Sequence, residues 1–280
     1  MSEGSNTSAE LQHALSGAQH QALALLHEQA RVSVTPIKRA TFHHPTMTID
    51  DSYACQLEWM RMRVEGGARI VGHKIGLTSK AMQAAMKIDE PDFGTLLDDM
   101  IKPNGATLRA ADYLDPRIEV ELAFVLGEQL GGDDVTADDV LAATAWVVPA
   151  LELIDARSYR VDPDDGTVRS VFDTIADNAA DAGVIIGDVT TPPGDVDLRW
   201  VAAILKQNGE VEETGVAAGV LDDPVQGIVW LAQRLARYGV SLEPGEVVLS
   251  GSFTRPVMCR AGDRFEVDYR ELGVITCQFT

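Results

Sequence analysis

The stretch over residues 118–126 constrains the fold of this chain more than any other. It starts with alternating apolar and acidic residues and continues as Ala123-Phe124-Val125-Leu126, which is apolar throughout. Alternation is typical of a strand with one buried face, whereas a continuous apolar run is typical of a strand that is covered on both faces. We therefore expect a sheet that is packed into the interior of the protein.

Most of the chain after residue 68 predicts further short strands with turn signals between them. Asn208-Gly209 favours a tight hairpin, because both residues tolerate the positive φ angles of a two-residue primed turn. One helix interrupts the strands, with Asp223 as its cap and Gly239 after its end. The expected strands cover residues 70–77, 118–126, 147–154, 182–186, 202–207, 210–212, 246–249, 265–269 and 274–279. This pattern is typical of a β-rich α+β protein without repeated βαβ units.

The first part of the chain carries helical patterns instead. Apolar residues recur at helical spacing from Ala9 to Ala30. A second helix begins at Thr48, which can form a capping box with Asp51, and stops at Gly66-Gly67. We therefore expect a small helical N-terminal domain over residues 1–67 and a β-rich catalytic domain over residues 68–280.

Composition excludes several classes of protein. The 280 residues carry 43 acidic and 23 basic side chains, a formal charge of −20, whereas a nucleic-acid binder needs a surplus of basic residues. No apolar run approaches the ~20 residues of a membrane-spanning helix. The first residues lack the basic and apolar regions of a secretory signal, and three cysteines are too few for a disulfide framework. We expect a cytoplasmic protein with no nucleic-acid or membrane partner.

Two carboxylates enter the central strand from the same side. Glu119 and Glu121 are two residues apart, so they project from one face, where two like charges need a partner. Glu152 stands in another apolar segment, residues 150–154, where an unpaired charge is expensive to bury. A divalent cation such as Mg²⁺ or Mn²⁺ would account for these carboxylates, because hard cations prefer oxygen ligands. The alternative is a solvated strand face that binds nothing.

Two more residues are candidates for proton transfer. Lys74 lies between Gly72 and Gly76, which let a ligand approach the backbone closely, and a nearby cation would lower its pKa towards acid–base use. Asp92 lies in Glu90-Pro91-Asp92-Phe93-Gly94. The alternatives are an ordinary surface lysine for Lys74 and a turn residue after proline for Asp92.

These candidates belong to four of five longer motifs in the chain. The motifs are Gly72-His73-Lys74-Ile75-Gly76-Leu77-Thr78-Ser79-Lys80, Glu90-Pro91-Asp92-Phe93-Gly94, Pro116-Arg117-Ile118-Glu119-Val120-Glu121, Pro149-Ala150-Leu151-Glu152-Leu153-Ile154-Asp155 and Gly251-Ser252-Phe253-Thr254-Arg255-Pro256. Together they resemble the hydratase/decarboxylase branch of the fumarylacetoacetate hydrolase superfamily. The resemblance runs from about residue 48 to residue 280, and the first 45 residues match less well. It implies a mixed β-sandwich or barrel-like core, preceded by a small helical domain.

The resemblance also implies a set of site residues. Glu119, Glu121 and Glu152 would hold Mg²⁺ or Mn²⁺, and Lys74 and Asp92 would be the catalytic residues that transfer protons. Gly251 and Ser252 would orient the carboxylate of the substrate.

Two further runs narrow the resemblance within the branch. Residues 172–179 and 213–220 are most similar to hydratases of seven-carbon 2-oxo-enoic diacids in homoprotocatechuate breakdown. The alternatives are a 2-oxopent-4-enoate hydratase, a 4-oxalocrotonate-type decarboxylase and, more remotely, a non-catalytic acidic binding protein. The resemblance implies a lyase with a small-molecule 2-oxo acid as substrate, and we expect a homo-oligomer.

A seven-carbon diacid carries a second carboxylate, which needs a dedicated cation in such an acidic protein. Arginine is suited to this because its planar fork binds a carboxylate in a bidentate way. Arg157 and Arg255 both lie near the predicted site segments. We favour Arg255 as the substrate-binding residue, and the alternative for it is a structural salt bridge.

Overall fold

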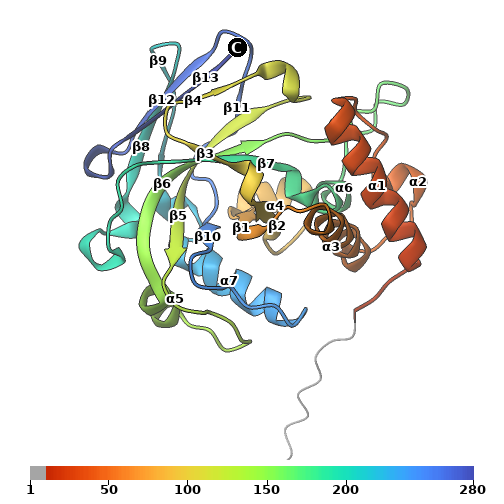
Figure 1. Ribbon diagram of the computed structural model, residues 1–280, viewed down its shortest axis with the longest axis horizontal. Helices are drawn as coiled ribbons and strands as arrows, with labels where there is room; N and C mark the ends of the chain where they lie inside the picture. The colour runs from red at the N-terminus through yellow and green to blue at the C-terminus, as the bar shows by residue number, and fades with distance from the viewer. Residues whose placement is uncertain (1–10) are drawn as a thin grey trace, which may run out of the picture.

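A computed structural model describes residues 11–280, in which two β-sheets form a sandwich and a group of helices stands beside it (Figure 1). The helices are α1 (Gly17–Ser33), α2 (Ala40–His43), α3 (Ile49–Glu65), α4 (Lys80–Met86), α5 (Ala137–Ala143), α6 (Val171–Ala176) and α7 (Pro224–Ala236). The strands are β1 (Ile70–Gly76), β2 (Asp92–Leu97), β3 (Ile101–Pro103), β4 (Ala106–Leu108), β5 (Arg117–Leu126), β6 (Thr144–Ile154), β7 (Asp181–Ile186), β8 (Ala202–Gln207), β9 (Glu210–Val216), β10 (Val247–Leu249), β11 (Val257–Met258), β12 (Arg264–Asp268) and β13 (Val274–Phe279). Within the described residues, none of the helices has both the length and the apolar character that crossing a bilayer requires.

Both sheets contain parallel and antiparallel strand pairs. The larger has the order β2-β1-β10-β5-β6-β7-β3, with β11 pairing beside β5, and the smaller has the order β4-β13-β12-β8-β9. Leu122 and Leu151 of the larger sheet share one hydrophobic core with Val267 and Ile275 of the smaller sheet. The predicted α+β fold with a mixed β-sandwich is confirmed. Over residues 11–280 neither sheet closes on itself, so the core is a sandwich rather than a barrel.

Strand β5 is buried on both faces, as its sequence predicts. Leu122 and Phe124 point into the core between the sheets. Ala123, on the opposite face, packs with Val148 of β6 and Leu249 of β10 in a second core. The two glutamates of β5 share that second face, because they stand two and four residues before Ala123.

Local signals for three other elements are confirmed. α3 begins after Thr48, whose hydroxyl accepts the amide of Asp51 in a capping box. Asn208-Gly209 forms the turn between β8 and β9, and both residues have positive φ angles. α7 begins after the Asp223 cap. In each case the cap or turn residues lie within three residues of one another in sequence, so local chemistry decides the structure.

The first helix begins later than its periodicity predicts. We expected it from Ala9, a position outside the described residues, but α1 begins at Gly17 after a capping box at Ser16. The chain before α1 is held by α3, because the Asp51 carboxylate accepts the amide of Ala14. A side chain distant in sequence therefore competes with the helix for these backbone groups.

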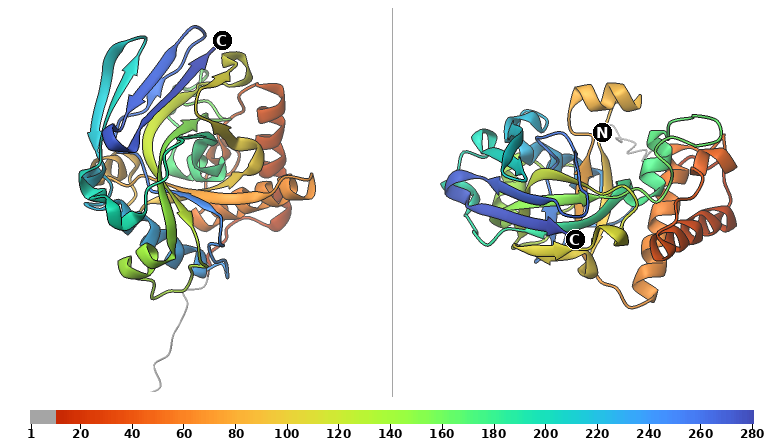
Figure 2. Two further views of the ribbon diagram at one scale, coloured as in Figure 1. Left: turned by 60° about the vertical axis from the view of Figure 1, so that its left-hand side comes forward. Right: turned by 90° about the horizontal axis from the view of Figure 1, so that it is seen from above.

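The helices before residue 66 lie at one side of the sandwich, beside α6 (Figures 1 and 2). Their buried side chains form two small hydrophobic clusters that also take in Ala176 of α6 and Leu97 of β2. The Gln56 amide of α3 donates to the main-chain oxygens of Phe93 in β2 and Ile175 in α6. A domain boundary at residue 68 stays a proposal.

Candidate metal and active site

Three glutamates meet on the second face of the larger sheet. Glu119 of β5 is directly opposite Glu152 of β6, and Glu121 is two residues further along β5. Ligand atoms of the three side chains all lie within 4.8 Å of one another. The residues are 7%, 1% and 0% exposed in the same order, so the structure brings together the predicted metal ligands in the interior.

Neighbouring elements hold this cluster in place. The amide of Gly251 donates to Oε2 of Glu121 at 2.9 Å. The hydroxyl of Tyr269, which follows β12 of the other sheet, donates to the main-chain oxygens of Ala150 at 2.7 Å and Glu121 at 3.1 Å. Oε1 of Glu121 is buried and has no hydrogen-bond partner among the described residues.

The cluster carries more negative charge than its protein neighbours compensate. Burial, together with the charge of Glu152, raises the pKa of Glu119 to about 8. The same two causes raise the pKa of Glu121 well above its usual range. An unpartnered buried oxygen and an all-oxygen donor set fit a hard divalent cation such as Mg²⁺ or Mn²⁺.

Lys74 on β1 is adjacent to this cluster. Its Nζ lies 3.1 Å from Oε1 of Glu152, and the residue is 3% exposed, so the surface-lysine alternative is wrong. Burial alone would lower the pKa of Lys74, but the charges of Glu152, Asp92 and Asp181 outweigh it and raise the pKa. Without a bound cation, therefore, Lys74 remains an ammonium group.

Asp92 is the first residue of β2 and is not in a turn, so that alternative is also wrong. It pairs with Gly76 at the end of β1, two residues beyond Lys74. Burial raises the pKa of Asp92 to about 6, although the charge of Lys74 opposes this. A carboxyl group with that pKa can both accept and release a proton near neutral pH.

A cavity of about 180 Å³ opens beside these groups. One part of its wall is ionisable, and another part is apolar and comes from α4 and the residues before it. Two arginines from the segment after β6 complete it. The lining residues include Lys74, Asp92, Glu119, Leu77, Met82, Met86, Arg160 and Arg169. Sequence reasoning missed α4 and both arginines, although Ser79 does cap α4 by accepting the amide of Met82.

Gly251 and Ser252 stand behind the cluster rather than in the cavity wall. Gly251 has a φ of +113°, and a Cβ there would lie 2.5 Å from the side chain of Thr78, so the position requires glycine. The hydroxyl of Ser252 donates to the main-chain oxygen of Thr254 at 3.0 Å. Gly251 thus positions Glu121, and binding of substrate by the pair stays a prediction.

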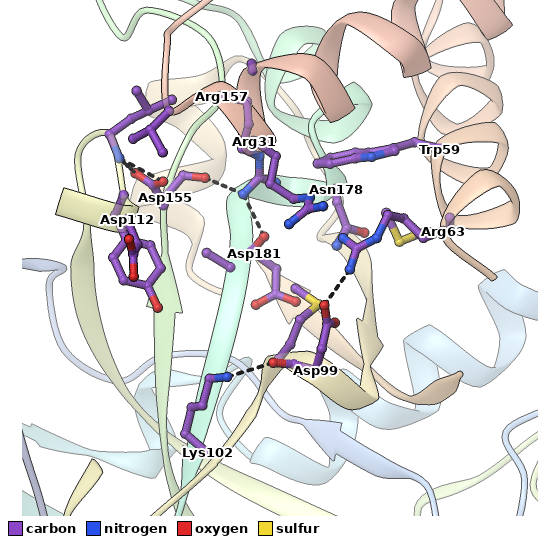
Figure 3. Close-up of a pocket in the computed structure, with 17 residues that line it drawn as sticks. Arg31, Trp59, Arg63, Asp99, Lys102, Asp112, Asp155, Arg157, Asn178 and Asp181 are labelled. Atoms are coloured by element: carbon purple, nitrogen blue, oxygen red, sulfur yellow. Dashed lines mark hydrogen bonds and ion pairs between the residues drawn. The ribbon is translucent and has the colours of Figure 1, made fainter. Parts of the chain in front are cut away.

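Neither arginine selected from the sequence faces the cavity. Arg255 has an 85% exposed side chain that pairs with Glu213 at 2.5 Å, which is the salt-bridge alternative. Arg157 is buried and pairs with Asp177 at 2.6 Å. Its guanidinium also donates to the main-chain oxygens of Asp155 and Asp181 (Figure 3). Both guanidinium groups are therefore already occupied by protein partners.

A separate hollow of about 200 Å³ is lined by Arg31, Trp59, Arg63 and Lys102 together with Asp181, and Figure 3 shows how these side chains lie. None of the three glutamates lines it. Asp181, the first residue of β7, is buried, and burial together with the charge of Glu152 raises its pKa well above its usual range. Sequence reasoning missed this residue, because a lone acid at the start of a strand has no distinctive pattern.

Comparison with known proteins identifies relatives of the chain. Residues 70–280 match the fumarylacetoacetate (FAA) hydrolase C-terminal family. The chain is 52% identical to a 2-oxo-hept-4-ene-1,7-dioate hydratase from Escherichia coli, over 93% of this chain and 97% of that protein. It is 39% identical to a 2-hydroxyhexa-2,4-dienoate hydratase from Comamonas testosteroni, over 91% and 95% of the two chains.

A solved structure of a related protein has the same fold. The 4-oxalocrotonate decarboxylase from Pseudomonas putida G7, complexed with magnesium and adipate, superposes with a TM-score of 0.91. It is 33% identical, and the match covers 96% of this chain and 100% of that one.

Proposed function

The chain belongs to the fumarylacetoacetate hydrolase family, and we propose that it is a divalent-metal-dependent hydratase that converts 2-oxohept-4-ene-1,7-dioate to 4-hydroxy-2-oxoheptanedioate. The observation that carries the chemistry is the buried cluster of Glu119, Glu121 and Glu152 beside Lys74. The substrate is supported by the hydratase of 52% identity. This reaction belongs to the meta-cleavage breakdown of aromatic compounds.

Glu119, Glu121 and Glu152 would hold Mg²⁺ or Mn²⁺. A divalent cation supplies Lewis-acid chemistry, because it draws electron density from the 2-oxo group of a bound substrate. Two observations support this assignment. Glu121 keeps a buried oxygen without a partner, and the related decarboxylase structure is described as complexed with magnesium.

Lys74 and Asp92 carry the proton transfers. Hydration requires that a proton leave C3 and another reach C5, after which water adds at C4 of the conjugated alkene and a proton returns to C3. Asp92, with its pKa raised to about 6 by burial, is suited to accept and return a proton. In the metal-free protein the acidic neighbours of Lys74 raise its pKa, so it carries an ammonium group that can donate a proton or balance negative charge.

A 4-oxalocrotonate-type decarboxylase is the second candidate, favoured by the TM-score of 0.91 to such an enzyme. Its substrate is a 2-oxo-3-enedioate, in which the alkene is conjugated to the 2-oxo group. Loss of CO₂ from this substrate needs the same withdrawal of electrons by the 2-oxo group. The two reactions therefore differ in the bond that breaks and in how the substrate is placed, not in the residues that the site must contain.

The proposal is tested with the full chain, Mg²⁺ and three substrates: 2-oxohept-4-ene-1,7-dioate, 2-oxopent-4-enoate and 4-oxalocrotonate. Loss of ultraviolet absorbance and release of CO₂ are followed together. We expect the highest kcat/KM on the seven-carbon diacid, with a hydroxylated product and no CO₂. Preferred release of CO₂ from 4-oxalocrotonate would establish the second candidate instead, and turnover of none of the three would overturn both. The homo-oligomer and the cytoplasmic location expected from the sequence stay predictions.

A further inference from the structure

Residues 160–169 form a short strap beside the cavity, and its two ends contribute Arg160 and Arg169 to the wall. The strap is a narrow hairpin, since Val161 bridges to Val168 and the amide of Arg169 donates to the main-chain oxygen of Arg160 at 3.0 Å. In Figure 1 it is the pale green loop next to α1.

The tip of the strap is fixed by the segment before α2. Lys38 pairs with Asp162 at 2.5 Å and with Asp164 at 2.6 Å, and Arg39 pairs with Asp162 at 3.1 Å. These contacts tie the strap to the helical part of the chain. The base of the strap, and with it Arg169, is thereby held in one place.

Arg169 differs from the other arginines around it. Arg117 and Arg160 both pair with Asp115, and Arg157 pairs with Asp177. No ion pair joins Arg169 to a carboxylate within residues 11–280, and its Nη1 is buried without a hydrogen-bond partner. A buried guanidinium nitrogen without a partner is costly, and a carboxylate is the group that best satisfies it.

The position of Arg169 also suits the far end of a diacid. Arg169 enters the cavity wall from the strap, whereas the lysine and the carboxylates of the polar centre enter it from β1, β2 and β5. Leu77, Met82 and Met86 supply the apolar wall of the same cavity, which suits a carbon chain. One cavity therefore offers a polar centre for the 2-oxo acid, an apolar surface and a separate cation.

We propose that Arg169 binds the distal carboxylate of the diacid and thereby selects diacids over monoacids. This assignment rests on the proposed function for its substrate. It replaces Arg255, which is exposed and paired with Glu213.

The test compares Arg169→Met with Arg255→Met, a matched control outside the cavity. In Arg169→Met we expect kcat/KM for 2-oxohept-4-ene-1,7-dioate to fall about tenfold to a hundredfold, the size of a lost charge-assisted hydrogen bond. We expect kcat/KM for 2-oxopent-4-enoate, which lacks the second carboxylate, to stay within about threefold of the parent. Arg169→Lys should restore part of the loss, because it keeps the charge. Arg255→Met should leave kcat/KM unchanged for both substrates.

A binding measurement separates this proposal from the proposed function. Adipate and hexanoate have six carbons each and differ in the second carboxylate, so the ratio of their affinities in the presence of Mg²⁺ reports on the distal cation. We expect the parent to prefer adipate about tenfold or more, and Arg169→Met to lose that preference while keeping its thermal unfolding midpoint.

The outcomes are distinct. If the parent hydrates none of the 2-oxo-enoates but Arg169→Met still loses the preference for adipate, the proposed function fails and the carboxylate site stands. If Arg169→Met keeps the preference for adipate, or if its kcat/KM falls equally for both 2-oxo-enoates, the assignment of Arg169 is overturned.

Discussion

Within residues 11–280, two groups of side chains have ligand atoms close enough to hold a metal ion. One consists of Asp51 with His13 and His20 in the helical part, and the other is the cluster around Glu121 in the sheet. At the first, the carboxylate of Asp51 accepts the amides of Ala14 and Thr48 and contacts Nε2 of His20 at 2.9 Å. Burial alone would raise the pKa of Asp51, but hydrogen bonds, those from Thr48 and His20 foremost, lower it.

At the second group, hydrogen bonds do not offset the effect of burial on the pKa. Glu121 accepts one amide, from Gly251, and its other oxygen has no partner among the described residues. Burial and the charges of Glu152 and Glu119 raise its pKa. Burial of acids alone therefore does not identify a site. Asp51 is satisfied by the fold and holds two segments together, whereas the glutamates are left with charge that a cation would balance.

The largest difference between the two groups should appear in catalysis. Glu121→Gln keeps the shape of the side chain but removes its charge, so we expect turnover to fall roughly 10³-fold or more, because loss of the metal removes several kcal/mol of stabilisation. Asp51→Asn should retain turnover within a few-fold at a temperature where it is folded. Steady-state assays at the lowest Mg²⁺ concentration that saturates the parent measure both. Full activity of Glu121→Gln would show that the metal takes no part in the reaction.

Lys74→Met tests the next largest effect. The substitution keeps the length of the side chain and removes the ammonium group beside Glu152. We expect kcat to fall by roughly 10²-fold or more, as general acid–base contributions imply, while Mg²⁺ still binds. Turnover within a few-fold of the parent would show that Lys74 only balances charge in the folded protein.

In contrast to the effects on turnover, the larger effect on the free energy of unfolding should come from the Asp51 substitution. Asp51→Asn weakens a helix capping box and a pairing with His20, so we expect the free energy of unfolding to fall by about 2–3 kcal/mol. Glu121→Gln in metal-free protein removes a poorly compensated acid, and its free energy of unfolding should be equal to or above that of the parent. Urea unfolding of both variants in chelator makes the comparison. A larger loss in Glu121→Gln than in Asp51→Asn would contradict this interpretation of the two groups.

The pH dependence of metal binding gives the smallest of these effects. The pKa of Glu119 is raised to about 8, so below that pH the metal-free protein holds a proton that a cation must displace. Affinity for Mg²⁺ should therefore rise with pH between pH 6 and pH 8, by about tenfold per unit for each displaced proton, and the raised pKa of Glu121 adds to this rise. Calorimetry in two buffers of different ionisation enthalpy measures the released protons. Asp51→Asn should leave the slope unchanged, and a flat profile between pH 6 and pH 8 would disagree with the raised pKa.

Local patterns in the sequence predict part of this site. The spacing of Glu119 and Glu121 places both on one face of a strand, and the apolar neighbours of Glu152 indicate that it is buried. The register that sets Glu119 opposite Glu152 joins strands distant in sequence, and no local signal reveals it. The difference between Arg169 and Arg255 depends on which carboxylates lie nearby after folding, so residue type and spacing do not distinguish them.

The central claim, that the three glutamates hold a divalent cation, is tested most directly by titrating the chelator-treated full chain with Mn²⁺. Electron paramagnetic resonance of free Mn²⁺ gives the number of bound ions. We predict one tightly bound ion per chain in the parent and in Asp51→Asn, and weakening by about a hundredfold or more in Glu121→Gln, more than the loss typical of residues that only support metal ligands. Equal affinity in the parent and Glu121→Gln, or loss of the ion in Asp51→Asn, would contradict the claim.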